Sequence, residues 1–111
     1  MSDNFNWYKP LANHMWRAYF SVIRSGADLD SDVKRRKYDA CHAVYILFPE
    51  RDRNIIKAYY TAKWGDAAYI VDDYSARHGI PVPAIYALIT KSQRAVVEQL
   101  GLIESEGRKS L

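Results

Sequence analysis

The polar residues best placed to contact another molecule recur at helical spacing in the C-terminal half of the chain. If the apolar residues between Ile85 and Val96 face a core, helix geometry turns a second set outward. This set is Ala84, Tyr86, Ala87, Thr90, Lys91 and Arg94, with Tyr86 near the boundary. A hydroxyl, an ammonium and a guanidinium group suit phosphate oxygens and base edges, and a tyrosine ring can pack on a sugar. The chemistry that this pattern predicts is contact with nucleic acid.

The residue pairs that could act in catalysis do not have the geometry for it. Cys41 and His42 are adjacent, as are Asp72 and Asp73. Adjacent helix positions do not face each other, so neither pair can share a proton or a substrate. No glycine-rich phosphate loop or nucleophile motif is present, and the sequence predicts that the protein is not an enzyme.

The acidic residues before residue 33 have the spacing of a calcium loop. Asp28, Asp30 and Asp32 occupy its first, third and fifth positions, but Val33 stands where the sharp turn needs glycine. The three histidines are scattered, without a partner at metal-ligand spacing. We therefore expect no metal and no cofactor, and we expect this polar connection to cap the following helix.

The segment from Ile70 to Leu100 has the spacing of two helices joined by a tight turn. Gly79 stands where a short first helix must reverse, and Ser75 is small enough for a second helix to cross closely. Ile85, six residues after the glycine, is the expected buried anchor of that second helix. A small residue, a turn glycine and an apolar residue at these offsets are typical of a helix-turn-helix.

Helical periodicity and the placement of Gly and Pro predict an all-α fold of about five helices. The expected helices cover residues 6–24, 33–48, 49–64, 67–78 and 83–100. Val33 and Tyr69 are expected to face inward. Gly101 is the expected C-terminal cap of the last helix, and residues 104–111 are expected to form a flexible tail.

The third to fifth expected helices resemble region 4 of sigma-70-type RNA polymerase factors. The resemblance covers a little over half of the chain and is carried by LFPERDRNIIKAYY at 47–60, IVDDYSARHGI at 70–80 and AIYALITKSQRAVVEQLGL at 84–102. The chain also resembles small phage-encoded late-gene activators of the ArpU-like kind. His78 stands where the family usually has Leu, and Val82 and Pro83 replace the polar residues that usually begin the recognition helix.

The resemblance implies a DNA-binding transcriptional regulator that contacts RNA polymerase, in a bacterial or phage setting, and leaves open whether it activates or represses. The last helix would lie against DNA, and Lys63, Arg77 and His78 would add phosphate contacts. From Asp66 to Leu100 the chain carries three Lys or Arg residues and four acidic ones, a net charge of −1. We therefore expect weak binding by the protein alone and tighter binding as a dimer or with the polymerase.

The N-terminal helix carries more aromatic residues than a small core readily buries. Because aromatic side chains are enriched at interfaces, Trp7, Tyr8, Trp16, Tyr19 and Phe20 are a candidate protein interface, which could join two copies of the chain. The alternative is that this helix buries its aromatic stripe within the monomer.

Composition is consistent with one soluble domain. The chain has 111 residues, 49% of them apolar and 26% charged, and a net charge of +3. A single cysteine excludes an internal disulfide and fits a reducing cytoplasm, and no apolar run is long enough to span a bilayer. Within the domain we expect an N-terminal helical part (residues 1–48) and a region-4-like unit (residues 49–103).

Two functions remain open at this stage. One is DNA binding through Thr90, Lys91 and Arg94. The other is a helix-turn-helix module that docks a protein, or inhibits one, through an apolar start of the last helix at Val82, Pro83, Ala84 and Ala87. The dense basic block at residues 34–37 is expected to be a solvated helix end balanced by its acidic neighbours.

Overall fold

Five helices and no strand make up the part of the chain that the structure describes, so the predicted all-α fold is confirmed. The computed structural model describes residues 8–26, 29–63 and 65–109, with side chains as far as Glu104. The helices are α1 (Tyr8–Ser25), α2 (Asp32–Tyr45), α3 (Glu50–Thr61), α4 (Ala67–His78) and α5 (Val82–Lys109).

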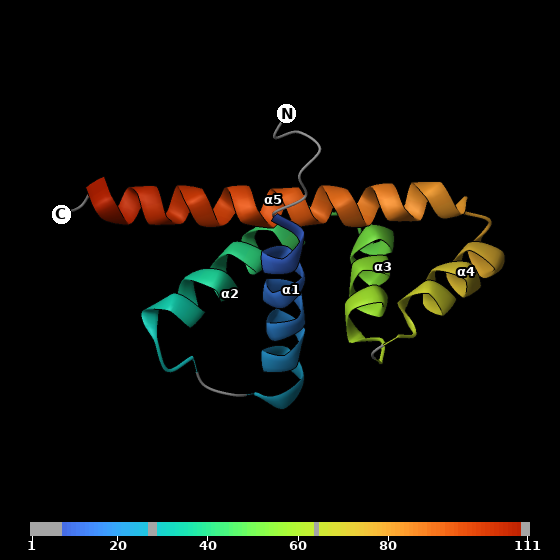
Figure 1. Ribbon diagram of the computed structural model, residues 1–111, viewed down its shortest axis with the longest axis horizontal. Coiled ribbons are helices and arrows are strands. Elements are labelled where there is room, and N and C mark those ends of the chain that lie inside the picture. The colour runs from blue at the N-terminus through green and yellow to red at the C-terminus, as the bar shows by residue number, and fades with distance from the viewer. Residues whose placement is uncertain (1–7, 27–28, 64, 110–111) are drawn as a thin grey trace.

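The last helix, α5, is a straight rod across one side of the molecule, and α1, α2 and α3 extend away from it (Figure 1). It has 28 residues and is therefore about 42 Å long at 1.5 Å per residue. One stripe of α5 faces the other helices, and it consists of Ile85, Ile89, Ser92, Gln93, Val96 and Leu100. Because this stripe recurs every three or four residues without interruption, the helix can be long and still pack along most of its length.

Trp16 is at the centre of the core, and its side chain is fully buried. Its ring lies nearly parallel to the rings of Phe20 and Tyr60, with centroids 5.8 and 6.2 Å away. Its indole Nε1 donates a hydrogen bond to the Ser92 carbonyl oxygen at 3.3 Å, which joins α1 to α5. Ser92 is itself fully buried, and its small side chain bonds back to the carbonyl of Ile89 at 2.7 Å. A small residue at this position lets the large indole lie directly against the α5 backbone.

A polar cluster joins α1, α3 and α5 beside this core. Asn13 Oδ1 accepts hydrogen bonds from the Tyr60 hydroxyl at 2.7 Å and from Gln93 Nε2 at 3.0 Å. Gln93 Nε2 also donates to the Tyr60 oxygen at 3.0 Å. Burial raises the pKa of Tyr60 well above its usual range, so the phenol stays protonated and able to donate. The three side chains fix the rotation of α5 relative to the helices below it.

Several local predictions are confirmed, and others are wrong. The bounds of α4 are those predicted, and the Ser31 hydroxyl caps α2 by accepting from the Lys34 amide at 3.2 Å. Gly101 does not end α5, and residues 104–109 continue the helix instead of forming a tail. The apolar stripe continues at Ile103, which packs against the core, and this contact offsets the low helix propensity of glycine.

Two residues expected to face inward lie on the surface. The exposed fractions of Val33 and Tyr69 are 55% and 69%. Each lies near the start of a short helix, where helical spacing alone does not say which neighbour will cover it.

We expect Trp16→Ala to lower the free energy of unfolding by about 3–5 kcal/mol, because it opens a large cavity and removes the indole donor to the Ser92 carbonyl oxygen. Urea unfolding followed by far-UV circular dichroism measures the change. The matched control is Leu47→Ala, which removes a large apolar side chain that is 82% exposed and should change stability by no more than about 0.5 kcal/mol. Equal losses in the two variants would contradict this account of the core.

Candidate nucleic-acid interface

A short turn joins α4 to α5 and sets the direction of α5. Gly79 has the left-handed backbone conformation (φ 66°, ψ 28°), and its amide donates to the Ser75 carbonyl at 2.9 Å. The Pro81 carbonyl then accepts from the amides of Ala84 and Ile85, at 2.9 and 3.2 Å, to begin α5. Ser75 is half-buried and Ile85 is buried. The burial of Ile85 confirms the sequence prediction for that residue, while the assignment of the helix pair to the helix-turn-helix class stays a prediction.

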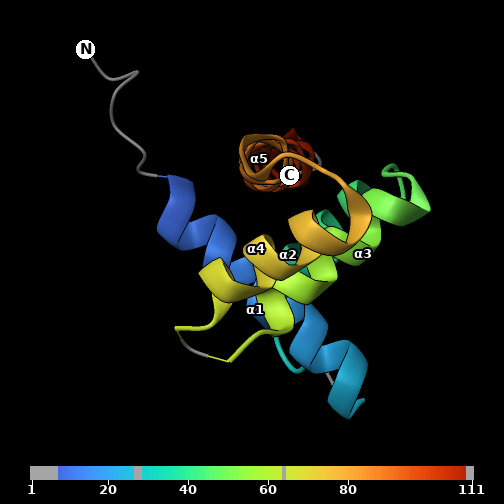
Figure 2. The same cartoon turned by 90° about the vertical axis from the view of Figure 1, so that its right-hand side faces the viewer.

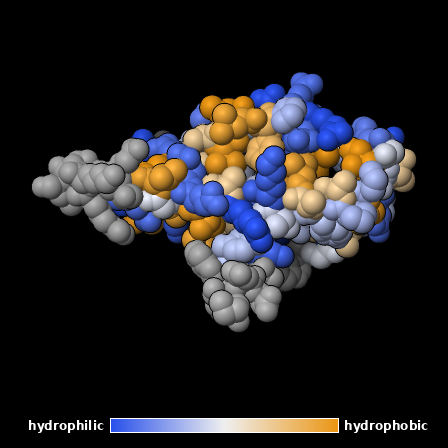
Figure 3. All heavy atoms as spheres, turned by 90° about the horizontal axis from the view of Figure 1, so that it is seen from above, coloured by the Kyte–Doolittle hydropathy of each residue, from blue (hydrophilic) through white to orange (hydrophobic). Residues whose placement is uncertain are grey.

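The outer face of α5 carries the residues expected there. Ala84, Tyr86, Ala87, Lys91 and Arg94 are exposed, and Thr90 is half-buried. Seen from above, hydrophilic and apolar residues are intermixed on this side of the molecule (Figure 3). The face begins with small alanine side chains and becomes cationic about two turns later. We call these six residues the α5 outer face.

The two cations of the α5 outer face are held over aromatic rings. The Lys91 Nζ atom lies 5.8 Å from the centroid of Phe48, in the connection between α2 and α3. The Arg94 guanidinium carbon lies 5.5 Å from the ring of Tyr8, and its Nε donates to the Tyr8 hydroxyl oxygen at 3.2 Å. The start of α1 and the α2–α3 connection lie on opposite sides of α5 (Figure 2). One cation therefore lies toward each flank, with its stem supported and its charge exposed.

Sequence reasoning missed a third cation beside this face, Arg51 at the start of α3. It lines a shallow hollow together with Ala84, Ala87 and Lys91. Its guanidinium pairs with the Asp52 carboxylate at 3.2 Å, so part of its charge is neutralised within α3. The sequence offered one indication of Arg51, because this residue lies in the first of the segments that resemble region 4. Only the packing of α3 under α5 brings Arg51 close to Lys91.

The three supplementary phosphate contacts predicted from the sequence divide into two groups. Arg77 and His78 lie in the last turn of α4, just before the turn to α5, and both are exposed. Arg77 pairs with Asp73 at 3.0 Å. Lys63 does not lie with them: it lines a hollow with Arg17 and Arg24, at the ends of α1 and α3 that point away from α5 (Figure 1). The structure therefore does not bring Lys63 onto one surface with Arg77 and His78, contrary to that expectation.

The aromatic interface predicted for the N-terminal helix is also wrong for three of its residues. Trp16, Tyr19 and Phe20 are buried within the monomer, because α2, α3 and α5 pack around α1. Tyr8 is half-buried beside Arg94. Trp7 lies outside the described residues. The monomer thus buries the aromatic stripe, which was the alternative that the sequence left open.

The remaining residues that the sequence singled out are a buried thiol, the scattered metal-ligand types and the basic block at residues 34–37. Burial raises the pKa of the Cys41 thiol well above its usual range, so its reactive thiolate form is scarce near neutral pH. No group of three or more His, Cys, Asp or Glu side chains lies together in a way that could hold a metal ion. The Lys34 ammonium pairs with Asp30 at 3.0 Å, as expected for a balanced helix end.

No helix in the described ranges combines the length and the apolar character needed to cross a membrane. Comparison of the chain with models of protein families, with curated proteins and with solved structures finds no match. Any function must therefore be argued from the residues of the chain itself.

We expect Gly79→Ala to destabilise the protein by about 1 kcal/mol, because alanine is strained at a positive φ angle. No atom lies within 4 Å of a Cβ added there, so the effect comes from the backbone alone. Gly79→Asn is the matched variant, since asparagine tolerates the left-handed conformation, and it should cost less. Urea unfolding compares the two. If Gly79→Asn lowered the free energy of unfolding as much as Gly79→Ala does, backbone strain would not be the cause of the destabilisation.

Proposed function

We propose that the protein binds DNA through the α5 outer face and acts as a transcriptional regulator. The observation that supports this most directly is the arrangement of Lys91 and Arg94. Each is exposed on α5, and each is positioned by an aromatic ring from a different side of the helix. Two positive charges fixed on the flanks of an exposed helix suit the phosphates that border a DNA groove.

The start of α5 fits a close approach to DNA. Ala84 and Ala87 add little bulk, so the helix backbone can lie near the floor of a major groove, which is about 12 Å wide. Alanine methyl groups can contact thymine methyls, and the donors of this face that suit guanine are those of Lys91 and Arg94, which also suit phosphates. Phosphate contacts therefore dominate this binding mode, and sequence discrimination is modest.

The charge balance supports weak binding by the isolated protein. Asp52 and Asp73 pair with the neighbouring Arg51 and Arg77, and Glu98 lies one turn beyond Arg94 on the same face. The resemblance to sigma region 4 supports a role for RNA polymerase as the partner that supplies the missing affinity. A second copy of the chain is the other source of affinity, through a surface other than the buried rings of α1.

A second candidate function is docking of a protein, and a different surface favours it. Ile46, Leu47 and Leu102 have exposed fractions of 55%, 82% and 60%. Leu47 and Leu102 line a hollow of about 470 Å³ between the α2–α3 connection and α5. Exposed apolar residues around a hollow are typical of protein contact sites. This surface lies beside Lys91, so a protein and DNA could contact adjacent parts of α5.

We expect the double variant Lys91→Ala/Arg94→Ala to weaken binding to a 30-base-pair duplex of random sequence. If each cation contacts one phosphate, the slope of log affinity against log salt falls in magnitude by about 1.8. Fluorescence anisotropy at a series of salt concentrations measures both the affinity and the slope.

Arg35→Ala is the matched control, because it removes an exposed cation near the start of α2, at the end of that helix that lies away from α5 (Figure 1). It should leave the salt slope unchanged. An unchanged slope in the double variant, with the fold intact by circular dichroism, would exclude the α5 outer face as the DNA contact.

A further inference from the structure

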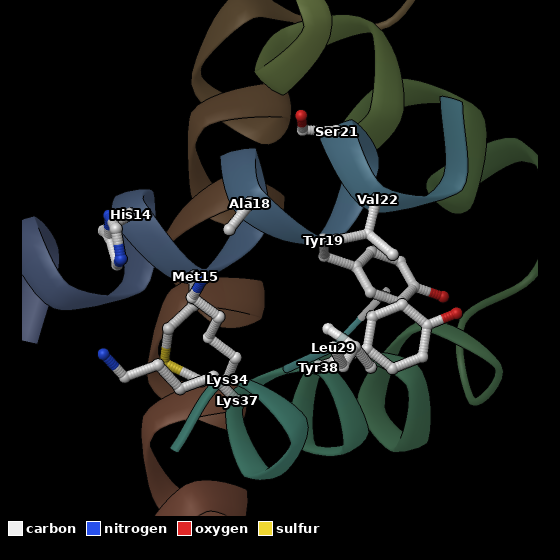
Figure 4. Close-up of a pocket in the computed structure, with 10 residues that line it drawn as sticks. All are labelled: His14, Met15, Ala18, Tyr19, Ser21, Val22, Leu29, Lys34, Lys37 and Tyr38. Atoms are coloured by element: carbon white, nitrogen blue, oxygen red, sulfur yellow. The ribbon is translucent and has the colours of Figure 1, made fainter. Parts of the chain in front are cut away.

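A hollow of about 280 Å³ lies between α1 and the start of α2, away from the α5 outer face (Figure 4). Its lining is mostly apolar or aromatic, and it consists of His14, Met15, Ala18, Tyr19, Ser21, Val22, Leu29, Lys34, Lys37 and Tyr38. The rings of Tyr19 and Tyr38 lie side by side at one end, and His14 and Met15 lie toward the other (Figure 4). Small-molecule sites are typically concave and apolar with a few polar groups, and this hollow has that character.

Contacts behind the two tyrosines hold this aromatic wall in place. Their ring centroids are 4.9 Å apart, and Tyr38 stacks on His42 at an interplanar angle of 6°. A 2.9 Å hydrogen bond joins the Tyr19 hydroxyl to His42 Nδ1. This bond holds the Tyr19 ring in place. Because Tyr19 is buried and Tyr38 is half-buried, Tyr38 offers more of the aromatic surface at this end of the hollow. A preformed wall of this kind binds a planar or aliphatic body without much rearrangement.

Two lysines line the hollow, and one of them is paired with a carboxylate. Lys34 is neutralised by Asp30 at 3.0 Å, but Lys37 has no carboxylate partner within the described ranges. Lys37 is also half-buried, so part of its aliphatic stem packs against the protein. An ammonium without a carboxylate partner at the edge of an apolar hollow can pair with the anionic group of a ligand.

We propose that this hollow binds a small amphipathic carboxylate. Its apolar body lies against Tyr19, Tyr38 and Val22, and its carboxylate lies at Lys37. The site is separate from the proposed DNA contact and does not depend on it. Because its lining comes from α1, α2 and the residue Leu29 before α2, an occupant holds these segments together. Both helices pack on α5, so a bound ligand would stabilise the whole fold.

The test is a titration with phenylacetate, followed in methyl NMR spectra at Met15, Val22 and Leu29. We expect saturable shifts at these three residues and none at Ile46 or Leu102. Phenylacetamide, which has the same body without the charge, should bind about fivefold more weakly or worse. Indole-3-acetate and hexanoate extend the range of apolar bodies. If none of the three carboxylates shifts these methyl groups at millimolar concentration, the proposal is wrong.

Two variants assign the binding to this hollow. Lys37→Met keeps the length of the side chain and removes its charge, so it should weaken phenylacetate binding about fivefold and leave phenylacetamide unaffected. Arg35→Met, on the exposed face of α2, is the matched control and should change neither. Ala18→Trp, at an exposed position, should fill the hollow and abolish the binding of both phenylacetate and phenylacetamide. The melting temperature of this variant shows whether it folds. Wild-type affinity for phenylacetate in Lys37→Met would overturn the assignment of the carboxylate.

Discussion

The burial of Trp16 against the backbone of α5 is the interaction on which the rest of the structure depends. An indole of this size finds room under a helix only where that helix presents a small residue, and Ser92 is the residue at the contact. Once the ring is placed, Phe20 and Tyr60 stack beside it, and hydrogen bonds join Asn13, Tyr60 and Gln93 Nε2. These contacts fix which side of α5 is hidden. The side that remains exposed, with its two cations, is a consequence of this burial.

Local structure was predictable from the sequence because its causes are local. Apolar spacing and a turn glycine gave the bounds of α4, and a short polar residue before the basic block gave the cap of α2. The outward set on α5 followed from the period of one helix. Gly101 shows the limit of such reasoning, since the helix continues through it when the next apolar residue packs against the core.

Placement of residues from different helices was not predictable in the same way. The direction of α3 under α5 decides two such placements. It brings Arg51, at the start of α3, close to Lys91, and it leaves Lys63, after the end of α3, far from Lys91. The aromatic stripe of α1 was compatible with either a partner chain or burial in the monomer, because counting rings does not say how many neighbours surround a helix. The hollow at Lys37 depends on how α1, Leu29 and α2 meet, and no pattern in the sequence indicated it.

The contact between Tyr8 and Arg94 has a practical consequence for anyone who prepares the protein. Tyr8 opens α1 directly beside the cationic part of α5, so the chain enters the described fold next to this surface. A purification tag or fluorophore joined on the N-terminal side of Tyr8 is therefore connected to the fold at this surface, and a polyhistidine sequence would bring charge of its own. The far end of α5 points away from this region, beyond α2 (Figure 1). Labels attached at that end leave the helix face undisturbed.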